Sequence, residues 1–374
     1  MTHTTTESAL FRPVRLGPLD LPNRLVMAPL TRNRAEADGV PSAVMATYYA
    51  QRASAGLIIA EAATPNAVGQ TYPHIPGIHT PAQVAGWRRV TDAVRAAGGR
   101  MVLQLQHGGR VGHPETSGLT PVAPSPVPLP ETLHTPSGRQ PSVVPREMTA
   151  TDIRATAADF AGAARNALDA GFEGVEVHSA NGHLLHQFLA ENTNRRTDAY
   201  GGPVTSRVRF VVEVVEAVAD AIGPERVGLR VSPGNTVNGI AEGDTALLYP
   251  TLVKALDDGL AYLHLGYADP DAPLFAELRR LWPGTLIANP RLALDEPPLP
   301  ASERLLAAGA DLIALGRSFL ANPDLVTRLR TGAPLNAVRE AYLMYTGGEE
   351  GYTDYPTLPA GPVSRQAAPD TAAR

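Results

Sequence analysis

The sequence contains no cysteine, and this absence excludes several kinds of chemistry. A chain without thiols has no disulfide, no thiolate nucleophile and no cysteine-ligated zinc or iron–sulfur cluster. Lysine is almost as scarce, because Lys254 is the only one and lies in LYPTLVKALDDG, a pattern that predicts an amphipathic outer helix. Schiff-base catalysis needs a lysine in a desolvated pocket. We therefore expect neither a pyridoxal-phosphate enzyme nor a class I aldolase.

The charge distribution and the apolar runs also limit the partners of the chain. The net charge is -5, and the arginines are scattered without a basic run, so we expect no nucleic-acid partner. No apolar run approaches the roughly 18 residues that span a bilayer. Residues 1–12 lack the basic region and apolar stretch of a signal peptide. We expect a cytoplasmic protein without a membrane partner.

Eight short β-rich runs alternate with helical patterns along the chain. The runs are mostly continuous and apolar, as in parallel strands that are buried on both faces. The predicted strands are RLVMAP (24–29), LIIAEA (57–62), MVLQLQ (101–106), GVEVHS (174–179), VGLRVS (227–232), AYLHLG (261–266), TLIAN (285–289) and DLIALG (311–316). The predicted helices cover 41–55, 81–97, 150–170, 205–222, 244–258, 272–281, 296–308 and 317–330.

This alternation predicts an α/β protein built as a single (β/α)8 TIM barrel. A doubly wound sheet is the alternative, but the first strand is not followed by the dinucleotide fingerprint G-x-G-x-x-G. We expect one domain over residues 1–358, with an N-terminal hairpin in FRPVRLGPLDLPNR. Residues 110–149 are rich in proline, serine and glycine, and form a long insertion after strand 3 that is either a functional lid or partly disordered. Residues 359–374 are expected to be a disordered tail.

Polar residues gather at the carboxyl ends of the predicted strands, where barrel enzymes carry their chemistry. They are Thr31, Glu61, Ala62 (the one apolar member), Gln104, His178 with Asn181, Arg230, His264, Asn289, Gly316 and Arg317. Neutral donors with one arginine suit a planar heteroaromatic ligand, and Gly316 with Arg317 suits its phosphate at a helix start. The alternative is a metal site formed by His178, His183 and His186, although metal hydrolases draw ligands from several strands.

Seven segments in one order resemble the Old Yellow Enzyme family of FMN-dependent ene-reductases. They are LPNRLVMAPLTRNRA (21–35), LIIAEAATPNAVGQTYPHIPGIHT (57–80), VLQLQHGGR (102–110), GVEVHSANGHLLHQFLAENTNRRTDAYGG (174–202), LRVSPGN (229–235), LIALGRSFLANPDL (312–325) and GGEEGYTDYP (347–356). The resemblance runs from about residue 10 to 358. It implies a (β/α)8 barrel that binds FMN noncovalently, with NADPH or NADH as the hydride donor.

The resemblance also implies roles for individual residues. The isoalloxazine would be lined by Pro29, Thr31, Ala62, Gln104 and Arg230, and the phosphate would be held by Gly316 and Arg317. His178 and Asn181 match the paired donors to a substrate carbonyl. Tyr72 and Tyr345 fall where family members place aromatic residues around the substrate.

The chain departs from the family pattern at three places. His183 occupies the position of a tyrosine that protonates the substrate, and with an ordinary pKa near 6.5 it would be an acid or base near neutral pH. We expect His183 to supply the proton directly or through water; otherwise it shapes the pocket and solvent supplies the proton. Gln106 replaces a frequent tryptophan, so it would line a wider or more polar pocket. Pro290 lacks a backbone N–H where phosphate is bound, and Arg291 is the candidate to compensate.

The expected function is an FMN-dependent NAD(P)H oxidoreductase, an ene-reductase, acting on α,β-unsaturated carbonyl, nitro or maleimide compounds. Hydride would pass from NAD(P)H to flavin N5 and then to the substrate β-carbon in a ping-pong cycle. An alternative on the same fold is a redox-neutral enone isomerase or a dehydrogenase, because of His183. A third alternative is a flavin-free barrel such as a metal hydrolase. The partner would be a small molecule, and the protein a monomer or homodimer.

Overall fold

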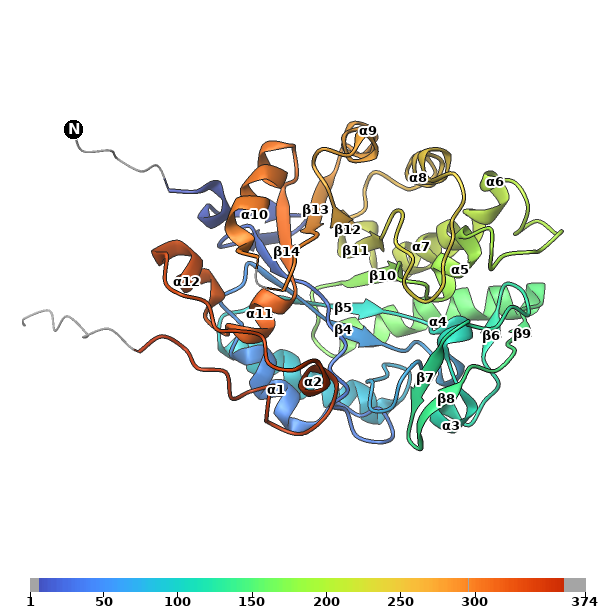
Figure 1. The fold of residues 1–374 in the computed structure, drawn as a ribbon, viewed down its shortest axis with the longest axis horizontal. Coiled ribbons are helices and arrows are strands. Elements are labelled where there is room, and N and C mark those ends of the chain that lie inside the picture. Colours follow the sequence, from blue (N-terminus) through green and yellow to red (C-terminus); the bar gives the residue numbers. More distant parts are fainter. Residues whose placement is uncertain (1–6, 295, 360–374) are drawn as a thin grey trace, which may run out of the picture.

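The computed structural model describes residues 7–294 and 296–359, so residues 360–374 of the predicted tail lie outside the described residues. Eight parallel strands close into a barrel (Figure 1). Their order around the barrel is β10-β11-β12-β13-β14-β3-β4-β5. Their bounds are β3 Leu25–Met27, β4 Leu57–Ala63, β5 Met101–Leu105, β10 Val175–Ser179, β11 Val227–Val231, β12 Tyr262–Ala268, β13 Thr285–Pro290 and β14 Leu312–Leu315. The predicted barrel and all eight of its strands are confirmed.

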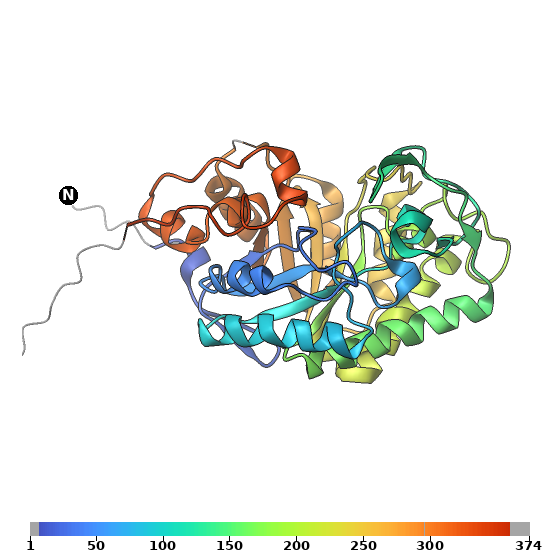
Figure 2. The same ribbon diagram turned by 90° about the horizontal axis from the view of Figure 1, so that it is seen from below.

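The helices lie outside the barrel strands (Figures 1 and 2). Their bounds are α1 Ala43–Ala50, α2 Pro81–Ala96, α4 Ala150–Asp169, α5 Leu184–Leu189, α6 Val204–Arg207, α7 Arg209–Ile222, α8 Thr245–Lys254, α9 Pro273–Leu281, α10 Pro298–Ala307, α11 Arg317–Ala321, α12 Leu325–Thr331 and α13 Ala341–Tyr345. Two predictions of a single helix were wrong. Residues 205–222 fall into α6 and α7, and residues 317–330 fall into α11 and α12. The second break follows from Pro323, because the residue before a proline avoids helical geometry, and Asn322 is extended at φ -129° and ψ 94°.

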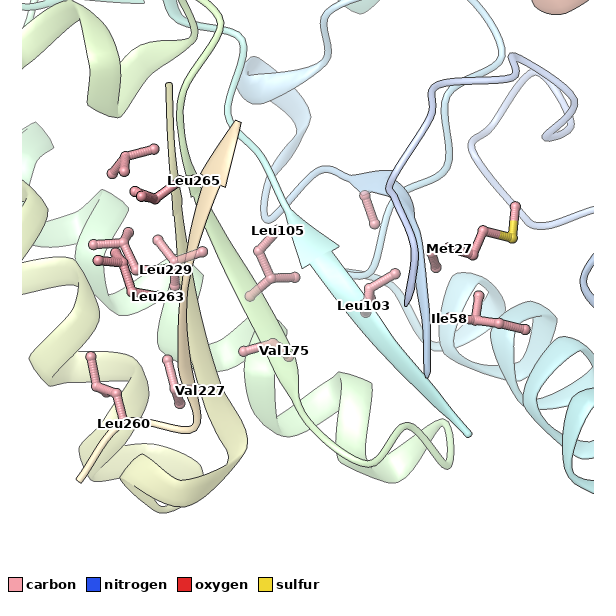
Figure 3. Packing of buried hydrophobic residues seen from close by; sticks show 14 of the residues in the cluster. Met27, Ile58, Leu103, Leu105, Val175, Val227, Leu229, Leu260, Leu263 and Leu265 are labelled. Atoms are coloured by element: carbon pink, nitrogen blue, oxygen red, sulfur yellow. The ribbon is translucent and has the colours of Figure 1, made fainter. Parts of the chain in front are cut away.

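The barrel wall is apolar on its outer face. Side chains alternate between the two faces of a strand, so every second residue points toward the helices. Outward residues such as Met27, Ile58, Leu103, Val175 and Leu229 belong to one large buried cluster with the helices (Figure 3). This burial supplies most of the hydrophobic stabilisation of the domain.

The inner face of the barrel is apolar only at the amino end of the strands. Inward residues that include Val26, Ile59 and Leu312 form a second cluster with Leu16 and Leu21. The last two belong to the predicted N-terminal hairpin, which is confirmed as β1 Val14–Leu16 paired with β2 Leu19–Leu21. The hairpin packs apolar side chains into the amino end of the barrel. The polar inward residues therefore lie at the carboxyl end of the strands.

The insertion at 110–149 forms regular elements. It contains α3 Pro114–Ser117, β6 Val122–Ala123, the antiparallel pair β7 Thr132–Thr135 and β8 Gly138–Pro141, and β9 Arg146–Glu147. Arg110 joins this insertion to the loop after β11, since its guanidinium donates to Pro128 O at 3.2 Å and to Asn238 O at 2.8 Å. The insertion thus stands over the same end of the barrel as the β11 loop.

Buried arginines hold the C-terminal segment against the barrel. Arg32, which follows β3, donates from Nε to Met344 O at 2.9 Å and from Nη2 to Gly351 O at 2.8 Å. Arg34 donates to Leu343 O at 2.8 Å. Each buried guanidinium satisfies backbone carbonyls that would otherwise lack donors. This contact places α13 and Tyr345 beside the carboxyl end of β3.

Within residues 7–294 and 296–359, no helix combines the length and the apolar character that a membrane span requires.

The close approach of backbone to Gly174, just before β10, is the basis of a first prediction. A Cβ at Gly174 would lie 2.2 Å from Arg226 O, so Gly174→Ala should lower the free energy of unfolding by about 1–3 kcal/mol. In the matched control Gly162→Ala, inside α4, the nearest atom is 3.9 Å away. The control should be neutral or more stable by up to about 1 kcal/mol. Urea unfolding of both variants checks this, and equal stabilities would contradict it.

Candidate active site

The carboxyl ends of five adjacent strands bring most of the predicted site residues together. Pro29 and Thr31 follow β3, Ala62 lies in β4, Gln104 lies in β5, His178 lies in β10 and Arg230 lies in β11. Cross-strand register places His178 beside Arg230 and Arg230 beside His264. Because all the strands are parallel, these side chains share one rim of the barrel. The comparable positions after β14 are Gly316 and Arg317.

A tight turn after β10 presents the two residues that match carbonyl donors. Asn181 has a left-handed backbone with φ 54°, and its N–H donates to Ser232 Oγ at 3.0 Å. Gly182 follows with φ 76°, and a Cβ there would lie 2.6 Å from Val237 O. Only glycine fits this second position, because the β11 loop covers it. The turn therefore fixes Asn181 next to His178.

His178 and His183 form a direct contact across this turn. Their Nε2 and Nδ1 atoms are 3.2 Å apart. Burial, first, and then neighbouring positive groups lower the pKa of His178 well below its usual value, and burial lowers the pKa of His183 to about 4. Both imidazoles are therefore neutral at neutral pH, so a single proton lies between Nε2 and Nδ1. When His178 carries that proton, His183 carries its own on Nε2.

The low pKa corrects one expectation. The ordinary value near 6.5 would make His183 a mixture of acid and base at neutral pH. In the folded chain the side chain is buried, and burial disfavours the imidazolium. His183 is a neutral donor or acceptor there.

His186 is separated from the site chemistry. Its Nδ1 accepts from the Gly182 N–H at 3.0 Å, and its Nε2 contacts Glu242 Oε1 at 2.5 Å. Both ring nitrogens are occupied, so His186 supports the turn that carries Asn181. Among residues 7–294 and 296–359, no group of three or more histidine, aspartate or glutamate side chains is placed to hold a metal ion.

A buried carboxylate joins the polar residues inside the barrel. Gln104 Nε2 donates to Glu176 Oε1 at 2.7 Å, and His264 Nδ1 lies 2.8 Å from Glu176 Oε2. Arg230 Nη1 lies 3.2 Å from His264 Nε2, and its Nη2 donates to Asn289 Oδ1 at 3.0 Å. One hydrogen-bonded chain thus runs from β5 through β10 and β12 to β11 and β13.

The charge states within this chain follow from its contacts. Burial opposes ionisation of Glu176, but the hydrogen bonds from His264 and Gln104 and the positive charge of Arg230 outweigh it and lower the pKa of the carboxyl. Burial, together with Arg230, lowers the pKa of His264 to about 4. Arginine stays protonated in proteins. Glu176 is therefore an anion, His264 is neutral and Arg230 is a cation.

Glu176 is a site residue that the sequence patterns did not single out. The signal was present, because an acidic residue stands inside an apolar strand, two positions before His178 and on the same face. Its partner in β12 is 88 residues away in the sequence. Only the register of the closed barrel shows that the two meet.

The predicted pocket residues also lie near one another. Burial, and then the nearby Tyr345, raise the pKa of Tyr72 to about 12. Tyr72 is half-buried and Tyr345 is 44% exposed. Gln106 is buried, and its Nε2 donates to Thr71 Oγ1 at 3.1 Å. A polar pair thus occupies the position after β5 where bulk is frequent in the resembling family.

The candidate phosphate residues lie at the neighbouring ends of β13 and β14. Gly316 is the residue before α11, and Arg317 Nη2 donates to Leu292 O at 2.8 Å. Pro290 is the last residue of β13 and Arg291 is exposed. Arg291 therefore follows β13 and Arg317 follows β14, which are neighbouring strands.

The polar groups of the rim fit the expected flavin. Within the part of the chain that the structure describes, His178 Nδ1, Asn181 Oδ1, His183 Nε2 and Arg230 Nε are buried without hydrogen-bond partners. Buried polar groups normally find partners, so such a cluster indicates a ligand surface. Gln104 turns its NH2 group to Glu176 and leaves its Oε1 for a ring N–H donor. These are groups that match the polar edges of an isoalloxazine.

Comparison with known proteins agrees with this geometry. A sequence profile of the NADH:flavin oxidoreductase / NADH oxidase family matches residues 9–336. A probable flavin mononucleotide-dependent alkene reductase of Leishmania infantum is 41% identical over 93% of this chain and 97% of the relative. The 12-oxophytodienoate reductase 1 of Oryza sativa subsp. japonica is 38% identical over 93% of each chain.

Two solved structures share the fold at similar identity. Morphinone reductase in complex with tetrahydroNAD is 44% identical, has a TM-score of 0.88 and covers 94% of this chain and 98% of its own. The Old Yellow Enzyme homologue from Zymomonas mobilis is 40% identical, has a TM-score of 0.89 and covers 94% of this chain and 100% of its own. With fold, site and both comparisons in agreement, the chain belongs to the Old Yellow Enzyme group of the NADH:flavin oxidoreductase / NADH oxidase family and is an FMN-dependent oxidoreductase.

Proposed function

We propose that this protein is an ene-reductase that uses NADPH or NADH to reduce the C=C bond of α,β-unsaturated carbonyl compounds. The observation that carries the proposal is the turn at His178, Asn181 and His183, which leaves buried polar atoms of all three residues without partners. A substrate carbonyl oxygen needs N–H donors, and the imidazoles and the Asn181 NH2 group of this turn can supply them. The alkene and 12-oxophytodienoate reductase activities named for relatives support the same reaction. Nitro compounds and maleimides are further substrates with a similarly polarised acceptor.

We propose the following roles for the residues of the rim. When bound, FMN would carry two electrons from the nicotinamide to the alkene. Thr31, Gln104 and Arg230 hold the polar edges of its ring system. The ring would also be lined by Pro29 and Ala62, and its phosphate would be bound by Gly316 and Arg317, which stand at the ends of β3, β4 and β14. Arg230 provides a fixed cation where negative charge develops on reduction.

The substrate is held by the turn after β10. In the tautomer with the proton on His178 Nε2, this N–H is shared between His183 Nδ1 and the carbonyl oxygen. Asn181 donates a second hydrogen bond from its side-chain NH2 group. These donors stabilise the enolate that forms as the β-carbon is reduced. Tyr72, Gln106 and Tyr345 line the opening through which the substrate enters. The insertion at 110–149 acts as a lid over this opening, because Arg110 fastens it to the β11 loop.

The proton for the α-carbon comes from solvent through His183. Because His183 is neutral, direct loss of its proton would leave a buried imidazolate, which is costly. Its Nε2–H instead orients a water molecule that donates the proton and is replaced from solvent. A change from tyrosine to histidine thus alters the route of the proton while leaving the carbonyl donors in place.

Net reduction is favoured over the alternative of redox-neutral isomerisation, since the relatives named here are reductases. We also propose that the protein works in the cytoplasm as a monomer or homodimer, without nucleic-acid or membrane partners. The net charge of -5 and the lack of a basic run support the absence of nucleic-acid and anionic membrane partners.

The carbonyl donors give a second prediction. His178→Ala and Asn181→Ala should each slow oxidation of the reduced enzyme by an enone by about 10²–10³-fold, because one donor to the enolate oxygen is lost. Reduction of the enzyme by NAD(P)H should change far less in Asn181→Ala. Stopped-flow absorbance of the flavin separates the two steps. A protein that carries no FMN after purification, or two variants with unchanged enone rates, would overturn the proposed function.

The proton route gives a third prediction. His183→Tyr should retain net reduction because the phenol is a donor, whereas His183→Ala should lose at least about tenfold in turnover. His183→Phe is the matched control for His183→Tyr, since it has similar bulk and no donor. Product yield per NAD(P)H consumed, measured under anaerobic conditions, also distinguishes reduction (one per product) from isomerisation (none). Full turnover in both His183→Ala and His183→Phe would show that His183 is not on the proton route.

The wild-type pH profile offers a further check on His183. Its pKa of about 4 means that the side chain stays neutral as the pH rises from about 6 to about 9. The rate of enone reduction should therefore show no inflection near pH 6.5 caused by this residue. An inflection there that disappears in His183→Tyr would contradict the neutral-donor assignment.

A further inference from the structure

We propose that Glu176 is a positioning residue that sets the reduction potential of the bound cofactor, because its buried carboxylate orients Gln104 and Arg230 and offsets part of the arginine charge. The inference rests on the proposed function in one respect, which is that FMN occupies the rim formed by these residues. It assigns a role to a side chain that touches neither the substrate nor the cofactor.

The first step concerns the orientation of Gln104. Both oxygens of Glu176 act only as acceptors, and Oε1 takes the Gln104 NH2 group at 2.7 Å. Gln104 must then present its Oε1 to the opposite side, toward the rim. An acceptor at this position selects a ligand with a ring N–H there. The carboxylate therefore determines that Oε1 of Gln104, and not its NH2 group, faces the cofactor.

The second step concerns the orientation of Arg230. Since Glu176 Oε2 accepts from His264, the neutral imidazole carries its proton on Nδ1. Its Nε2 is then an acceptor for Arg230 Nη1 at 3.2 Å. Asn289 Oδ1 accepts from the other terminal nitrogen at 3.0 Å. Two of the three guanidinium nitrogens are thus held by protein acceptors, and Arg230 Nε remains buried and unpaired among the described groups.

The negative charge of Glu176 also offsets part of the positive charge of Arg230. Glu176 and His264 are both fully buried, so the field of the carboxylate is screened less than it would be in water. The anion lies one side chain away from Arg230, the cation that favours the reduced and negatively charged cofactor. Glu176 therefore opposes reduction, whereas Arg230 promotes it. The potential reflects the difference between the two.

A charge-neutralising substitution tests this balance. In Glu176→Gln the anion is lost with little change of shape, so the midpoint potential of bound FMN should become more positive. We expect about a tenfold change in the equilibrium constant for reduction, which is about 30 mV for a two-electron couple. Dye-coupled anaerobic reduction of the holoenzyme measures this. An unchanged or more negative potential would overturn the inference.

Glu242→Gln is the matched control. Glu242 is likewise buried and likewise pairs with a histidine, His186. Within the described residues, none of its hydrogen bonds leads to Gln104 or Arg230. Its substitution removes the same charge and the same kind of contact. The potential should change by less than half of the shift in Glu176→Gln. Equal shifts in the two variants would mean that the position of Glu176 is not special, and would refute the assignment.

Glu176→Asp serves if Glu176→Gln does not fold or does not retain FMN. It keeps the charge but shortens the side chain, so FMN should bind more weakly. The equilibrium constant for reduction of the bound FMN should stay within about threefold of the wild-type value. A large positive shift in this variant would overturn the inference. Failure of the proposed function is separately visible, because the wild-type protein would then hold no FMN or would not reduce enones.

Discussion

A carboxylate with no access to water must find donors for both of its oxygens, and the polar half of this barrel is arranged around that requirement. Glu176 draws one donor from β5 and one from β12. The β12 donor in turn fixes Arg230 of β11, which also reaches Asn289 of β13. Strands that are adjacent through their backbones are thereby joined a second time through their side chains. One connected set of hydrogen bonds thus links Gln104, Glu176, His264, Arg230 and Asn289 across five strands.

The barrel interior is divided by height. At the amino end, Leu16 and Leu21 of the hairpin pack against inward residues such as Ile59. An apolar plug of this kind keeps water away from the polar layer above it. Glu176 then interacts with its partners in a medium of low effective dielectric, where a single charge has large consequences. Burial of their own side chains at the carboxyl end lowers the pKa values of His178 and His183.

Most of the fold could be predicted from the sequence because buried parallel strands are continuous apolar runs. The boundaries of helices were less predictable, as the break at Pro323 shows. The positions of His178, Asn181 and Arg230 also followed from the strand ends, given a barrel. Their protonation states did not. The pKa of His183 depends on burial beneath a loop that is distant in sequence, and the pairing of Glu176 with His264 depends on cross-strand register.

The arginine contacts of the C-terminal segment have a consequence for biosynthesis. Arg32, next to Thr31, donates a hydrogen bond to the carbonyl of Gly351, which lies 319 residues later in the chain. At roughly 5–20 residues per second, Gly351 is added about 16–64 s after Arg32. The contact between the end of the first barrel strand and the C-terminal segment therefore forms only after Gly351 has been added.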